Sequence, residues 1–209
     1  MSKARRKQRA QSGPKGKSFE QRIAQRLREV YDPPELLAQI EKATQEKRIK
    51  DRTVLLKRSA VRRSDQGRGA KEPDVVVTER CPCWFECQDA DAAHHAPLAK
   101  FAQAERDLEE TQMAGVLWPV AICHKTGGQK IGVWMSFHHL VLLANIQPIK
   151  GIEGEPGPLN LYSKGFELEQ PVRLDLEDFL MLLRDDFARR TEAAAERMAL
   201  LQRNAANGR

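Results

Sequence analysis

Apolar residues recur at helical spacing near the start of the chain and again near its end. A first helix is predicted to begin at Ser18 and to end before Pro33, and a second follows over 34–45. The first helix carries an apolar stripe, bordered by Glu20, that consists of Phe19, Ile23, Leu27 and Val30. Further helices are expected at 97–112, at 138–146 and, as a long run, at 176–204.

Between these helices, short segments rich in β-branched and aromatic residues have the character of strands. The predicted strands are 53–57, 73–77, 83–88, 116–124 and 130–136. Gly127 and Gly128 separate the last two, so a hairpin is expected there. This order of elements favours an α/β fold in which a mixed central β-sheet is flanked by helices and followed by a long C-terminal helix.

Composition divides the chain into four parts. Residues 1–16 are expected to form a disordered basic arm, 17–146 the folded core, 147–170 a loop or insertion rich in glycine and proline, and 171–209 a C-terminal helical extension. The chain has no run of 18 apolar residues and no secretory signal pattern. These features predict a cytoplasmic protein that makes no membrane contact and keeps its four cysteines reduced.

Charge is distributed unevenly along the chain. Residues 1–80 hold 22 of the 35 Lys and Arg but only 11 of the 29 Asp and Glu, a local charge of +11, so the remainder sums to −5. Such asymmetry is typical of proteins that bind a polyanion, because each phosphate neutralised by Lys or Arg releases a counterion. The alternative is a solvated basic face with a disordered tail.

Two acidic residues stand where a sheet would bring them together. Asp74 precedes three valines that must be buried, and Glu86 lies inside the next predicted strand. Alternate residues of a strand share a face, so Glu86 and Gln88 should point one way while Phe85 and Cys87 point the other. If the two strands are neighbours, Asp74 and Glu86 meet at the edge of the sheet.

Two carboxylates in contact repel each other unless a proton or a cation lies between them. Mg²⁺ suits this position because it prefers a few carboxylate oxygens together with water and phosphate, and Mn²⁺ is expected to substitute for it. Such an ion can polarise a phosphoryl oxygen and lower the pKa of a bound water. The predicted chemistry is therefore hydrolysis of a phosphodiester, with basic residues of the first half holding the DNA backbone.

These residues resemble the signature of the PD-(D/E)XK nuclease superfamily, in which a helical Glu is followed by Pro-Asp and then by Glu-X-Lys on the next strand. The matching residues are Glu20, Pro73-Asp74 and Glu86-Cys87-Gln88. Segment 16–22 and the Arg-, Ser- and Gly-rich segment 62–69 are similar to those of archaeal and bacteriophage Holliday-junction resolvases. The resemblance covers residues 17–143 and implies a restriction-endonuclease-like core.

The resemblance implies a role for each matching residue. Asp74 and Glu86 would ligate Mg²⁺ together with the backbone carbonyl of Cys87, and Glu20 would complete the metal site or orient its water. Resolvases of this kind act as homodimers that cut opposite strands of a four-way DNA junction, an arrangement that twofold symmetry permits. The residues expected to contact DNA are Lys17, Arg62, Arg63, Arg68 and Lys71.

One residue departs from the signature. Gln88 stands where the family has its lysine, and it can only hydrogen-bond, whereas a lysine can position the attacking water and stabilise negative charge. Some restriction endonucleases of this fold carry Gln at this place, so the change does not by itself abolish activity. Lys100 on the following helix is a candidate for a migrated cation, and Lys71 is a second one.

Three functions are compatible with this pattern. Structure-specific cleavage of branched DNA, in recombination or repair, follows from the resolvase-like order of motifs. A sequence-specific or mismatch-type endonuclease of the same fold is the alternative suggested by Gln88. The third interpretation is a nuclease-derived protein that binds DNA without cutting it, because the signature lysine is absent.

Two other sets of residues invite a functional interpretation. A zinc site is one hypothesis for Cys81, Cys83, Cys87, His94 and His95, but structural zinc sites usually use Cys pairs separated by two to four residues. The three tryptophans, Trp84, Trp118 and Trp134, lie on predicted strands, where core packing is favoured over base stacking.

Overall fold

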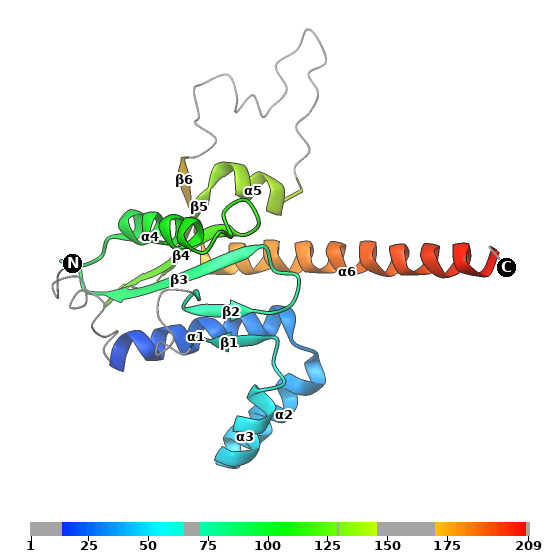
Figure 1. Ribbon diagram of the computed structural model, residues 1–209. Helices are drawn as coiled ribbons and strands as arrows, with labels where there is room; N and C mark the ends of the chain where they lie inside the picture. Colours follow the sequence, from blue (N-terminus) through cyan, green and yellow to red (C-terminus); the bar gives the residue numbers. More distant parts are fainter. Residues whose placement is uncertain (1–13, 65–71, 129, 146–169, 208–209) are drawn as a thin grey trace, which may run out of the picture.

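The computed structural model describes residues 14–64, 72–128, 130–145 and 170–207, and Figure 1 draws the rest of the chain as a thin grey trace. Most of the predicted basic arm and most of the 147–170 loop therefore lie outside the described residues. The same holds for two predicted DNA contacts, Arg68 and Lys71.

Six strands form one mixed sheet whose spatial order follows the order of the chain, from β1 to β6. The strands are β1 (Val61–Arg63), β2 (Val75–Val77), β3 (Cys83–Ala90), β4 (Trp118–Lys125), β5 (Ile131–Ser136) and β6 (Pro171–Asp175). β3 and β4 are parallel, whereas every other neighbouring pair is antiparallel. The mixed sheet and the β4–β5 hairpin confirm the predictions made from the sequence.

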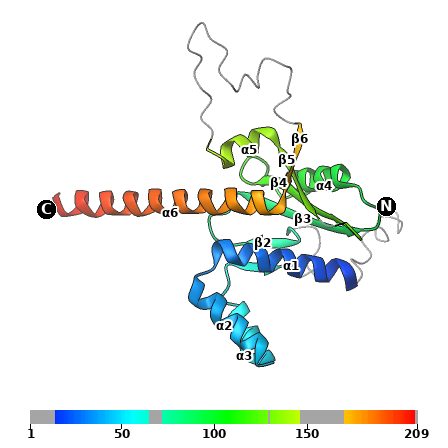
Figure 2. The same cartoon turned by 180° about the vertical axis from the view of Figure 1, so that it is seen from behind.

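The helices are α1 (Pro14–Tyr31), α2 (Pro34–Gln45), α3 (Ile49–Leu56), α4 (Pro97–Glu110), α5 (Phe137–Leu143) and α6 (Leu176–Asn207). α1 and the first turns of α6 cover one face of the sheet, and α4 covers β3 and β4 on the other face (Figures 1 and 2). α2 and α3 pack on each other and project from the end of α1 (Figure 1). The chain is thus a mixed α/β protein.

The larger hydrophobic core lies between the sheet and helices α1 and α6. The predicted stripe of α1, which is Phe19, Ile23, Leu27 and Val30, is buried against strand residues that include Val75 and Phe85. On the opposite face, Phe101 and Leu108 of α4 take part in two smaller clusters. Burial of apolar surface, worth about 25 cal/mol per Å², therefore holds α1 and α4 on opposite sides of β3.

One predicted strand is wrong, and two strands escaped prediction. Residues 53–56 belong to helix α3, in which the Thr53 hydroxyl donates a hydrogen bond to the carbonyl of Ile49 one turn earlier. Packing on α2 thus overrides the modest β propensity of this segment. The strand that pairs with β2 is instead β1, which was not predicted because Arg62 and Arg63 make its sequence atypical of a strand. The second missed strand is β6, whose residues were assigned to the helical extension.

Helix α6 has 32 residues, of which only the first turns are packed against the sheet. Leu176, Phe179 and Leu183 are buried there, whereas the C-terminal half projects beyond the sheet and exposes Met198 and Leu201 (Figures 1 and 2). Within the part of the chain that the structure describes, no helix has the length and apolar character needed to cross a bilayer.

Candidate active site

The pairing of β2 with β3 places Asp74 beside Glu86. Val75 is the register partner of Phe85, so in an antiparallel pair the preceding Asp74 faces Glu86. Oδ2 of Asp74 accepts a hydrogen bond of 2.8 Å from the backbone N–H of Cys87. This bond satisfies a backbone donor of β3, and it directs the Asp74 carboxylate toward Glu86.

Lys100 of α4 lies between the two carboxylates. Its Nζ is 3.3 Å from Oδ2 of Asp74 and 2.8 Å from Oε2 of Glu86. The lysine side chain is 14% exposed and that of Glu86 only 4%, so the three charged groups are largely shielded from solvent. The structure therefore brings together three of the residues that the sequence singled out, including the candidate migrated lysine.

Two further side chains, Trp84 and Gln103, support Glu86 from the same side of the sheet. Nε1 of Trp84 donates to Oε1 of Glu86 at 3.2 Å, and Nε2 of Gln103 donates to Oε2 at 3.0 Å. Gln103 also accepts a hydrogen bond from Lys100 at 3.4 Å and donates one to Asp107 at 3.3 Å. Both oxygens of Glu86 are thereby fixed in position, as is common for groups that must act in one geometry.

The sequence analysis did not identify Trp84 and Gln103 as part of the site. The available signal was their spacing: Trp84 precedes Glu86 by two residues on a strand, and Gln103 follows Lys100 by three on a helix. Each pair therefore projects from one face of its element.

Glu20 reaches the same site from α1, on the other face of the sheet. It is 3% exposed, and its Oε2 lies 3.3 Å from Nη1 of Arg63 on β1. The pKa of Glu20 is raised by burial and by the nearby charge of Asp74, against the opposing effect of Arg63. Glu20 is thus close enough to feel the charge of Asp74, and Arg63 contacts Glu20 directly.

The acid–base properties of Glu86 follow from its surroundings. Burial, together with the negative charge of Asp74, raises the pKa of Glu86 to about 7, although Lys100 acts in the opposite direction. For Lys100, burial alone would lower the pKa, but Asp74 and Glu86 outweigh it and hold the pKa above its usual value. Lys100 is consequently a permanent cation at neutral pH, whereas Glu86 titrates there.

Gln88 does not join this cluster. Its Oε1 accepts a hydrogen bond of 3.2 Å from the backbone N–H of Ala96, and its Nε2 donates to the carbonyl of His94 at 3.5 Å. The side chain therefore braces the loop that leads into α4, the helix that carries Lys100. In this structure the cation of the site comes from position 100 and not from position 88.

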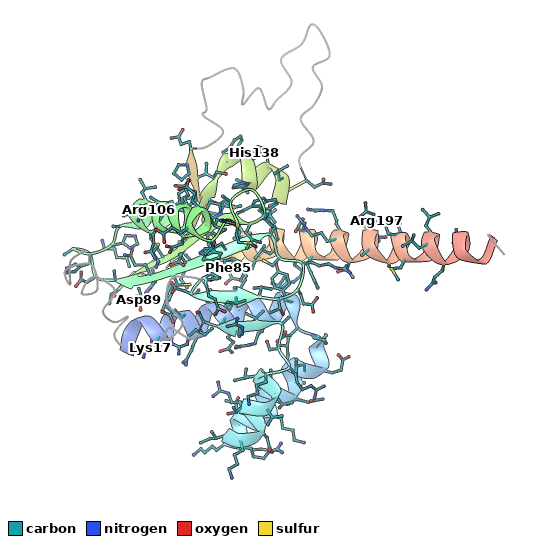
Figure 3. All side chains as sticks on the ribbon, in the orientation of Figure 1. Lys17, Phe85, Asp89, Arg106, His138 and Arg197 are labelled. Carbon is teal, nitrogen blue, oxygen red and sulfur yellow. The ribbon has the colours of Figure 1, made fainter. Side chains whose placement is uncertain are left out.

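The remaining predicted residues lie around the cluster. Arg62 pairs with Glu72 through two hydrogen bonds of 3.1 Å, the salt-bridged arrangement that competes with a phosphate contact. Lys17 is exposed at the start of α1, at the same end of the molecule as Asp89 near the end of β3 (Figure 3). The side chain of Cys87 is buried in the main core, so only its backbone faces Asp74.

The donor atoms around Lys100 suit a divalent metal ion only in part. Among the described residues, no group of three or more His, Cys, Asp or Glu side chains is arranged to hold a metal ion, which also applies to the hypothetical zinc set. Asp74 and Glu86 nevertheless offer hard carboxylate oxygens, the ligands that Mg²⁺ prefers, with one monovalent ammonium between them. The donor chemistry fits a divalent ion, but an ion bound by both carboxylates would replace contacts that Lys100 makes.

Comparisons with protein-family models, with characterised proteins and with solved structures each find no match to this chain.

Proposed function

We propose that this protein is a Mg²⁺-dependent endodeoxyribonuclease with a restriction-endonuclease-like core, and that it cuts branched DNA such as four-way junctions. The observation that carries the proposal is the convergence of Asp74 and Glu86, from neighbouring strands, on the ammonium of Lys100. Two acids and a lysine in contact beside β2 and β3 are the side chains that the PD-(D/E)XK resemblance requires, with the lysine supplied from α4. Glu20 joins them from α1.

In this proposal Asp74, Glu86 and the backbone carbonyl of Cys87 hold the metal ion, for which Mn²⁺ can substitute. When bound, the ion supplies a Lewis acid and lowers the pKa of a coordinated water. Lys100 stabilises the negative charge that develops on the phosphate and orients the attacking water. Gln103 and Trp84 keep Glu86 in place, and Glu20 would complete the metal site or orient its water.

The basic first half of the chain supports DNA as the substrate. Arg63 contacts Glu20, and Lys17 is exposed on α1 one turn before Glu20, so we propose that both contact phosphates of the bound DNA. A homodimer would present two such sites to the two strands of a junction, as symmetric cleavage requires. We therefore propose junction DNA and a second copy of this chain as the partners.

A second candidate function is branched-DNA binding without cleavage. The observation that favours it is the position of the Lys100 ammonium, which contacts both carboxylates and offsets part of their negative charge without a metal ion. A protein of this kind would bind DNA with a strong dependence on salt, and it would not depend on Mg²⁺.

The decisive experiment is a cleavage assay on a labelled four-way junction and on a linear duplex of the same base composition, each with Mg²⁺, Mn²⁺ or EDTA. We expect paired nicks on opposite strands of the junction with either metal and none with EDTA. Asp74→Asn and Glu86→Gln should each lower the rate by at least about a hundredfold, because removal of a group that stabilises the transition state costs this much or more.

Glu35→Gln is the matched control, since Glu35 is an exposed acid on α2, away from the cluster. It should cut like the parent. If the parent binds the junction in a salt-sensitive manner but cuts it with neither metal, the binding function replaces the nuclease. If Asp74→Asn and Glu86→Gln cut as well as Glu35→Gln, the site is assigned wrongly.

A further inference from the structure

A row of residues crosses the sheet from the candidate active site toward its far edge. Glu86 is the neighbour of Ala121, Ala121 pairs with Trp134, and Trp134 pairs with Arg173. Residues directly opposed on adjacent strands share a face, so Trp134 and Arg173 stand on the same face as Glu86. Helix α4 packs mainly on β3 and β4, and among the described residues it contacts β5 less and reaches little of β6.

The ring of Trp134 is held in a defined position and is only partly buried. Phe101 belongs to the small cluster that supports it. The ring lies against Gly132, where an added Cβ atom would be only 2.4 Å from Cη2 of Trp134. By contrast, Trp84 on the same face is 3% exposed. Trp134 thus combines a fixed aromatic surface with access from solvent.

The surroundings of Trp134 are cationic. The guanidinium carbon of Arg173 lies 5.8 Å from the centroid of the ring, and half of the Arg173 side chain is exposed. Exposed Lys130 is close by and shares Asp175 with Arg173. His95 meets the ring edge-on at 6.2 Å, and its buried Nδ1 has no hydrogen-bond partner within the described part of the chain.

We propose that Trp134 and Arg173 bind an unstacked nucleobase of the DNA, with Trp134 stacking on the base and Arg173 contacting its phosphate. An aromatic surface beside cations suits a planar ligand that carries negative charge, and stacking is tolerant of sequence. A base inside a duplex has both faces covered by its stacked neighbours, whereas a base at a branch point can leave the stack, so the site selects for branch points. This inference rests on the proposed function and deepens it by giving the origin of the preference for branched DNA.

The spacing of the strands sets the position of that base. Trp134 is two strands away from Glu86, or about 10 Å, and one strand of DNA rises about 3.4 Å per nucleotide. The stacked base is therefore about three nucleotides from the phosphate that is cut.

Binding is measured by fluorescence anisotropy with the full chain carrying Asp74→Asn, so that the DNA stays intact. Trp134→Leu should weaken binding to the four-way junction about 5- to 150-fold, the range for one lost stacked base. Binding to linear duplex should change by less than about twofold, because every internal base stays stacked between its neighbours. Trp134→Phe should retain most of the affinity, and Arg173→Gln should lose about 2- to 30-fold.

Trp118→Leu is the matched control. Trp118 also lies beside an arginine and a histidine, Arg190 and His139, but it packs with the main core on the other side of the sheet. This variant should bind both DNAs like the Asp74→Asn parent. Arg173→Gln and Trp134→Phe provide the test if circular dichroism shows that Trp134→Leu does not fold.

The outcomes separate this inference from the proposed function. Equal losses on junction and duplex, or no loss on either, would overturn the stacking site, even though cleavage by the unmodified chain would still support the nuclease. If the unmodified chain neither binds nor cuts any of these DNAs, both proposals fail together.

Discussion

The ammonium of Lys100 lies 2.8 Å from Oε2 of Glu86, and both side chains are largely hidden from solvent. An ion pair in such a place interacts more strongly than one on the surface, but each partner alone would be an uncompensated buried charge. Asp74, 3.3 Å from the same nitrogen, adds a second negative charge. The stability of the β2–β3 pair and the chemistry proposed for the site therefore depend on the same three side chains.

Lys100→Met should destabilise the protein and stop cleavage. Without the ammonium, Asp74 and Glu86 repel each other in a buried place, which we expect to lower the free energy of unfolding by about 3 kcal/mol at pH 8. Added Mg²⁺ should restore more stability to this variant than to the parent, because the ion takes over the neutralisation. Urea denaturation with and without Mg²⁺ measures both effects.

Lys50→Met serves as the control for this prediction, since Lys50 is exposed on α3. It should change the free energy of unfolding by less than about 0.5 kcal/mol. Equal responses of the two variants to Mg²⁺ would show that the ion does not bind at the carboxylate pair.

Glu86 should make stability fall as the pH rises through neutrality. Its pKa is about 7 in the folded protein against an ordinary value of 4.5, so the folded state binds the proton more tightly than the unfolded state does. The contribution of this group is therefore fully present below pH 4.5 and is lost as the pH rises to 7. The loss amounts to about 3 kcal/mol.

Glu86→Gln removes this dependence. Urea denaturation at pH 5 and at pH 8 gives the free energy of unfolding of both proteins. The value for the variant minus the value for the parent should be larger at pH 8 than at pH 5. A constant difference between the two proteins would mean that Glu86 titrates normally. In the parent, cleavage should rise up to tenfold per pH unit below pH 7, because the metal requires the carboxylate.

Gln103 is a positioning residue, and its loss should be visible in the pH profile. Gln103→Leu removes the hydrogen bonds to Glu86 and Lys100 but keeps the bulk of the side chain. Hydrogen bonds to a carboxylate favour its charged form, so the variant should need a higher pH for half-maximal cleavage. Its maximal rate should fall about tenfold, the cost of about 1.4 kcal/mol in the barrier.

A change in folding alone would lower the amount of active protein without moving the pH profile. Gln39→Leu, on the exposed surface of α2, is the matched variant and should leave both quantities unchanged.

A buried aspartate outside the site should be important for the fold. Asp32, 6% exposed, accepts hydrogen bonds of 2.6 Å from the Ser59 hydroxyl and 2.7 Å from the backbone of Ala60, and so ties the end of α1 to the start of β1. Asp32→Ala leaves these donors unsatisfied and should cost about 2–4 kcal/mol in urea denaturation. Asp51→Ala, at an exposed salt bridge, should cost less than about 1 kcal/mol.

The spacing of apolar residues was sufficient to predict the long helices and strands, because an element that buries one face repeats apolar residues along that face. The stripe on α1 and the alternation along β3 are examples: Phe85 and Cys87 lie in the main core while Glu86 faces α4. β1 and β6 could not be predicted, because each is short and contains charged residues. Their strand structure depends on pairing with a neighbouring strand. The strand prediction for residues 53–56 was wrong for a related reason: packing on α2 outweighs the local β propensity of this segment.

For the candidate site, the sequence predicted the meeting of Asp74 with Glu86 from strand alternation alone. The contacts of Lys100 depend on how α4 crosses the sheet, and no local pattern encodes this. For the same reason Gln103 was missed, and the bond between Arg63 and Glu20 could not be foreseen, because it joins residues 43 positions apart. The metal itself stays a prediction.

The amide of Gln88 holds the loop from which α4 departs, and α4 carries Lys100. A lysine at position 88 would release that loop and bring a second ammonium beside the first. The two positions should therefore be epistatic: Gln88→Lys would be tolerated only after Lys100 has been lost. A stepwise exchange of the lysine between positions 100 and 88 would have to pass through an intermediate with either two cations or none.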